Sequence, residues 1–114
     1  MDSSPEDRLD AIYQAYNTAF EHRASDIADA QSDAEAKAIR ANVNALELTY
    51  LDAERRGLEA NGPAVEAAYQ AAKDAAHDVT AAYREGRALA DRIRSVSSAV
   101  TATASLLTKA AAVA

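Results

Sequence analysis

Large apolar residues recur along the chain at spacings of three, four and seven residues. Such spacing places them on one face of an α-helix. Two stripes of this kind precede residue 57; their members are Leu9, Tyr13, Tyr16 and Phe20 in the first, and Ile39, Val43, Leu46 and Tyr50 in the second. The pattern predicts helix on both sides of residues 28–38, a segment with no large apolar residue.

After residue 63 the pattern becomes a strict seven-residue repeat, which is typical of helices that pack along a continuous seam. Its members are Val65, Ala72, Val79, Gly86, Ile93, Val100 and Leu107. A glycine in a helix interior costs about 1 kcal/mol relative to alanine, and we interpret Gly86 as an accommodation of close packing. These seven residues form the predicted interaction seam together with Ile39, Val43, Leu46 and Tyr50 of the first half.

The stretch from Gly57 to Pro63 separates the two halves and holds two of the three glycines. Ser4 and Pro5 suit the start of one helix, and Pro63 suits the start of another. We therefore predict an all-α protein built as a long antiparallel hairpin. Its helices would span about 5–60 and 63–112, with a rigid hairpin turn at 57–63.

Antiparallel helices that turn near residue 61 would bring Val43 opposite Val79. The same register sets an acidic segment, from Asp26 to Glu35, against a basic one, from Arg84 to Arg94. A lone hairpin leaves part of so wide an apolar stripe uncovered. We therefore predict a homodimer that forms an elongated four-helix bundle with coiled-coil packing.

Residues 28–38 leave a second architecture open. Ser32 and Glu35 match a capping box, the signature of a new helix start. Breaks near residue 31 and at residues 95–98 would fold the same pattern into a compact monomeric bundle of three or four helices. The lack of glycine and proline between residues 6 and 56 favours the continuous helix.

Composition narrows the class of partner. The net charge is −6, and the first 35 residues hold nine acidic and two basic residues, a balance of −7. An acidic chain argues against general binding of nucleic acid. No run of about twenty apolar residues is present, so we predict no membrane span. The N-terminus lacks the basic and apolar regions of a signal peptide. We expect one cytoplasmic domain over residues 1–114, with secretion without a cleavable signal peptide left open.

No cofactor or catalytic constellation is predicted. The arrangement nearest to a metal site is Asp74 and His77 with Asp78, opposite Glu47 in the hairpin register. Di-iron bundles use such carboxylate-x-x-His pairs, but they need two pairs and further carboxylates in the core. We expect these residues to form a solvated polar face, and a metal-binding bundle is the least favoured alternative.

Four residues widen the apolar stripe beyond what one partner helix would bury, and they form the predicted partner surface: Tyr69, Tyr83, Leu48 and Leu51. Because no site for catalysis accompanies them, we expect a non-catalytic helical interaction module. A scaffold, an adaptor or an export chaperone would fit, binding itself or another helical protein.

The turn reads Arg56-Gly57-Leu58, and the segment from Tyr50 to Glu54 has the spacing of a Tyr-x-x-x-acid signal. In size, central turn and acidity the chain resembles, in architecture only, the W-x-G family of type VII secretion substrates. The chain has no tryptophan, and the Tyr-x-x-x-acid spacing precedes the turn. The resemblance implies a small secreted helical hairpin as an alternative function.

Overall fold

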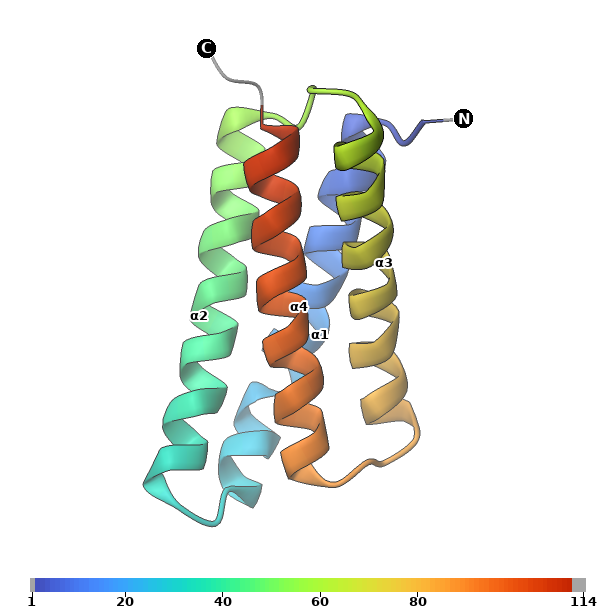
Figure 1. Cartoon of the computed structure of the whole chain (residues 1–114). Coiled ribbons are helices and arrows are strands. Elements are labelled where there is room, and N and C mark those ends of the chain that lie inside the picture. The colour runs from blue at the N-terminus through green and yellow to red at the C-terminus, as the bar shows by residue number, and fades with distance from the viewer. Residues whose placement is uncertain (1, 112–114) are drawn as a thin grey trace.

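The computed structural model describes residues 2–111 and is all-α, which confirms the predicted fold class. Four helices follow one another along the chain (Figure 1). Their bounds are Pro5–Asp29 for α1, Asp33–Arg56 for α2, Pro63–Arg84 for α3 and Leu89–Ala110 for α4. Met1 and residues 112–114 lie outside the described part, as does the predicted helix end at residue 112.

Local signals in the sequence set the helix starts. Ser4 accepts a hydrogen bond from the amide of Asp7 at 3.0 Å, and the Asp7 carboxylate accepts one from the amide of Ser4 at 3.1 Å. This capping box pairs two amides that the first turn of a helix leaves free. Pro5 and Pro63 stand at the starts of α1 and α3, where a missing amide hydrogen is tolerated.

The first predicted helix is interrupted at residues 30–32, so the continuous helix was wrong and the alternative break near residue 31 is confirmed. Ser32 caps α2 by accepting the amide of Glu35 at 3.2 Å. The Glu35 carboxylate in turn accepts the amide of Gln31 at 2.7 Å. Helices gain most of their stability from packing, and a segment without large apolar residues offers a continuous helix little to bury.

The second predicted helix is interrupted at Gly86, whose φ of +66° favours glycine. The amide of Gly86 donates to the carbonyl of Tyr83 at 3.2 Å, and the amide of Arg87 donates to the carbonyl of Ala82 at 3.0 Å. This pair of bonds is the Schellman ending of a helix. Gly86 therefore terminates α3 instead of easing the packing of a longer helix. The break lies at residues 85–88, before the predicted one at 95–98.

The four helices form a compact bundle with principal extents of 44 × 25 × 18 Å. Helix α1 packs against all three others, whereas α2 and α3 lie on opposite sides of the core (Figure 1). The predicted elongated hairpin of two long helices is therefore wrong, and the compact four-helix alternative describes the chain. The resemblance to the W-x-G family rested on size, a central turn and acidity; in the structure the central turn joins the second and third of four helices instead of two long ones.

The same arrangement changes the argument for a dimer. The elongated dimer was inferred because a lone hairpin cannot cover its own seam. Here the folding of α1 and α4 onto the other helices covers that seam within one chain. Any association of two copies must therefore use the outer surface of the bundle.

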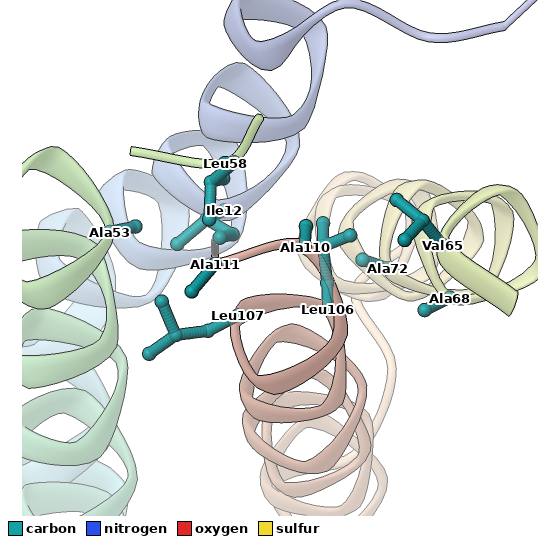
Figure 2. Packing of buried hydrophobic residues seen from close by; sticks show 10 residues of the cluster. All are labelled: Ile12, Ala53, Leu58, Val65, Ala68, Ala72, Leu106, Leu107, Ala110 and Ala111. Atoms are coloured by element: carbon teal, nitrogen blue, oxygen red, sulfur yellow. The ribbon is translucent and has the colours of Figure 1, made fainter. Parts of the chain in front are cut away.

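The segment between α2 and α3 crosses the end of the bundle instead of making a side-by-side hairpin (Figure 1). Leu58 is 1% exposed and points into the core beside Ile12 (Figure 2). The amide of Ala60 donates to the carbonyl of Ala110 at 2.9 Å. The turn is thus a packed lid over one end of the core, held by its side chain and its backbone.

The residues of the predicted seam take three different places. Buried members are Val65, Ala72, Val79, Leu107, Ile39, Val43 and Leu46; Ile93, Val100 and Tyr50 are partly buried, and Gly86 is exposed in the turn. In α4 the fully buried positions with large side chains are Thr103 and Leu106, outside the seven-residue repeat. The repeat loses its phase at Gly86 because the chain reverses there and α4 presents a different face to the core.

Candidate functional site

An aromatic face lies on the outside of the bundle where α1 and α2 pack together. We define it by Tyr13, Tyr16 and Phe20 of α1 and Tyr50 of α2. Ring centroids lie 5.2 Å apart between Tyr13 and Tyr50, and 5.8 Å apart both between Tyr16 and Tyr50 and between Tyr16 and Phe20. These distances are typical of interacting aromatic pairs. The four rings thus form one continuous cluster.

Two rings of the aromatic face are open to solvent, whereas Tyr16 and Tyr50 are partly buried and pack against the core. Tyr13 is 40% exposed and Phe20 is 44% exposed. The guanidinium of Arg23 lies 5.0 Å from the centre of the Phe20 ring, over its face. Clusters of exposed aromatic side chains on a small protein mark interaction surfaces more often than isolated apolar residues do.

Two glutamates of α2 hold the tyrosine hydroxyls. Tyr16 donates to Glu47 and Tyr50 donates to Glu54, each at 3.1 Å. Partial burial, followed by the hydrogen bond to a carboxylate, raises the pKa of both tyrosines above the ordinary value of 10. The hydroxyls are therefore neutral donors at physiological pH. Each of these two tyrosine side chains is held by ring contacts within the cluster and by the hydrogen bond of its hydroxyl.

A depression lies at each end of the aromatic face, and the two depressions carry opposite charges. The one near the start of α1 is lined by Glu6, Leu9, Asp10, Tyr13 and Tyr50. The one near the end of α1 is lined by Arg23, Ala24, Ile27, Arg40 and Asn44. The first lining has two acids and no base, and the second has two bases and no acid. None of these four charged side chains forms an ion pair within residues 2–111.

The residues of the predicted partner surface separate into two pairs. Leu48 and Leu51 are 67% and 52% exposed on α2, and together they line a shallow depression. Leu51 lies one helical turn beyond Glu47 and so borders the aromatic face. Tyr69 and Tyr83 instead pack against the two core clusters. The structure therefore brings only the two leucines to the outer surface of α2.

Sequence reasoning missed the aromatic face because it assigned the stripe of α1 to the core. The helix buries a neighbouring stripe instead, whose apolar members are Ala11, Ile12, Ala15 and Ala19. Small alanines at two of these positions, Ala15 and Ala19, pack in one core cluster with residues of the other three helices. The larger aromatic side chains are then left at the edge, on the side of α2. The regular spacing of Ala11, Ala15 and Ala19, four residues apart on one face, was the available signal.

A polar cluster, separate from the aromatic face, joins α1, α3 and α4 at the end of the bundle opposite the crossing turn. Tyr83 donates a hydrogen bond to Asp26, and Arg92 forms an ion pair with Asp26 at 3.2 Å. Arg92 also pairs with Asp29 at 3.3 Å, and the ring of His22 stacks on Tyr83 at 3.8 Å. Asp26 is 4% exposed, so this cluster fastens helix ends together instead of offering a reactive group to solvent.

The predicted charge register is realised by one arginine of the basic segment. Of the four arginines, Arg92 reaches the acidic segment, while Arg87 pairs with Asp78 and Glu85, and Arg94 pairs with Asp91. Fewer ion pairs therefore join the acidic and basic segments than the sequence indicated. Arg87 does not contribute because it lies in the turn that ends α3 and faces its own helix.

The metal-like residues of the sequence lie on the outer surface. Asp74, His77 and Asp78 are exposed and border a shallow depression together with Arg84. Glu47 lies on α2, which does not pack against α3. Within residues 2–111, no group of three or more histidine, aspartate or glutamate side chains is placed to hold a metal ion.

None of the helices in residues 2–111 is both long and apolar enough to cross a lipid bilayer. We compared the chain with known protein families, curated protein sequences and solved structures. None of the three comparisons finds a match, and no family is assigned to the chain.

Proposed function

We propose that the protein is a non-catalytic interaction module that binds a protein partner through the aromatic face between α1 and α2. The observation that carries the proposal is the aromatic cluster itself, in which Tyr13 and Phe20 are exposed to solvent and the partly buried Tyr16 and Tyr50 hold them in contact. Rigid aromatic side chains lose little conformational entropy on binding and dominate the energetics of many interfaces.

The surroundings of the aromatic face support this proposal. Polar and charged residues border the rings at both ends, in the manner of the polar rim around an interface core. Leu48 and Leu51 extend the apolar surface along α2. The partner predicted from the sequence was a second copy or another helical protein, and a surface built from two adjacent helices suits either.

The test is site-specific photo-crosslinking in the cells that express the protein. A photoreactive residue placed at Phe20 or Leu51 should give a covalent adduct with one identified protein. The same residue at Lys73 of α3 or Thr101 of α4, both exposed on the other side of the bundle, should give none. Equal labelling at all four positions, or no adduct at Phe20 and Leu51, would overturn the proposal.

A further inference from the structure

The aromatic face has a property that identifies its partner. An acidic depression lies at one end and a basic depression at the other, and no charged side chain of either lining forms an ion pair within residues 2–111. When a second copy docks antiparallel on this surface, the acidic depression of each copy faces the basic depression of the other. The surface is therefore complementary to itself in charge. We infer that the partner is a second copy of this chain, docked antiparallel through the α1–α2 surface. This inference rests on the proposed function and names its partner.

The spacing of the residues along α1 fits a two-fold axis. Such an axis would lie in the plane of the interface, perpendicular to the helices, at the level of Tyr16. Asp10 lies six residues before Tyr16 and Arg23 lies seven residues after it, so Asp10 of one copy faces Arg23 of the other. Tyr13 then faces Phe20 of the second copy. The acidic depression of each copy then meets the basic depression of the other, and the aromatic side chains meet at the centre.

The spacing along α2 places the axis at the same level. Glu54 and Arg40 each lie seven residues from Glu47, one after it and one before it. Glu47 accepts the hydroxyl of Tyr16, so the centres found on the two helices are in direct contact. Two independent helices therefore agree on one symmetry axis.

The available area suits a reversible dimer. Two helices about 36 Å long, lying side by side, present a face of roughly 700 Å². Specific interfaces bury about 800 Å² on each partner. The opposite docking, with both copies parallel, would set the two acidic depressions against each other. The antiparallel arrangement is the one that the charges allow.

Symmetry also gives Glu47 a distinctive role. A residue on a two-fold axis meets its own copy, so two Glu47 carboxylates approach each other in the dimer. Glu47→Gln removes this repulsion while keeping an acceptor for Tyr16. The substitution should tighten the dimer about threefold or more, because like charges placed opposite each other are unfavourable.

Sedimentation of the full chain over a range of concentrations and at low salt tests the inference. Wild-type protein should form a dimer, and Asp10→Arg or Arg23→Asp should each raise its dissociation constant about tenfold. The double variant should recover most of the wild-type affinity, because the exchanged charges meet across the axis. Lys73→Asp, on α3, serves as the control and should leave the dissociation constant unchanged.

A monomer at all concentrations, or a dimer whose double variant does not recover, would overturn the inference. The photo-crosslinking experiment separates this failure from failure of the proposed function. An adduct at Phe20 with a different protein would retain the interaction module and remove the self-partner. No adduct at Phe20 or Leu51 would remove both.

Discussion

The guanidinium of Arg8 donates a hydrogen bond of 2.7 Å to the carbonyl of Leu58, across fifty residues of sequence. Arg8 is fully buried, and it also reaches Ala60, Asn61 and Glu66. The planar guanidinium can supply five N–H donors, which suits a turn that exposes several carbonyls to one point. Arg8 thus connects the first helix to the segment that crosses the end of the bundle.

Removing this side chain should be the most destabilising change at a charged position. Arg8→Ala leaves the carbonyls of Leu58 and Ala60 and the partly exposed Glu66 carboxylate without their donor, and each buried acceptor left unsatisfied costs about 1–3 kcal/mol. Urea unfolding followed by circular dichroism measures the change. Arg55→Ala, at an exposed arginine, should shift the free energy of unfolding by less than about 0.5 kcal/mol. Equal effects of the two substitutions would contradict the role of Arg8.

Leu58 and Leu48 offer a matched pair of leucines. Leu58 is 1% exposed and Leu48 is 67% exposed. Leu58→Ala should lower the free energy of unfolding by about 2–5 kcal/mol, because it leaves a cavity under the crossing turn. Leu48→Ala should change it by less than about 0.5 kcal/mol. A small effect at Leu58 would contradict the packing of this turn as a lid over the core.

Substitution of Gly86 by alanine distinguishes the four-helix bundle from the hairpin of two long helices, because the two architectures predict stability changes of opposite sign. In the structure its φ of +66° is unfavourable for alanine, so Gly86→Ala should destabilise the protein by about 1 kcal/mol. In a continuous long helix the same change would stabilise it by about 1 kcal/mol. Thermal unfolding of the variant measures the sign. Gly86→Asn should lose less than Gly86→Ala, because asparagine tolerates positive φ better.

Tyr83 should make stability fall at alkaline pH. Burial, with the hydrogen bond to Asp26, raises the pKa of Tyr83 above its ordinary value of 10. Above pH 10 the unfolded chain loses the tyrosine proton while the folded protein keeps it, so the free energy of unfolding decreases as pH rises. Below pH 10 this contribution is fully present.

The alkaline decline is measured by denaturant unfolding at a series of pH values. Tyr83→Phe cannot ionise, and it should therefore show a shallower decline than the wild type above pH 10. Some decline should persist, since the pKa values of Tyr16 and Tyr50 are also raised. An identical pH dependence in Tyr83→Phe and wild type would refute the assignment.

Helix content and helix starts could be predicted from the sequence because their causes are local. The Ser4 cap, the two prolines and the apolar spacing act within a few residues of one another. The buried positions Val65, Ala72 and Val79 of α3 also follow from spacing alone. The break at Ser32 was visible as an alternative, but its local signal could not outweigh the absence of glycine and proline.

The aromatic face could not be predicted from the sequence, since a helical stripe reveals which residues share a face but not which face is buried. In α1 the helix turns its alanines inward and leaves Tyr13 and Phe20 at the edge. That choice depends on how the other three helices pack on α1, which local sequence does not specify. The two arginines of the basic depression, Arg23 of α1 and Arg40 of α2, are likewise brought together only by the pairing of these helices.

The sequence by itself determined that this chain is helical, where most of its helices begin, and which residues of α3 face inward. Tertiary structure alone decided how many helices there are and in what order they pack. Gly86 could sit within a helix at a cost of about 1 kcal/mol or end one at no such cost, and the choice depends on whether α4 can fold back onto α3. The turn from Gly57 to Pro63 became a lid over the core because Leu58 and Arg8 meet there. Both side chains gain that contact only after distant segments of the chain have assembled.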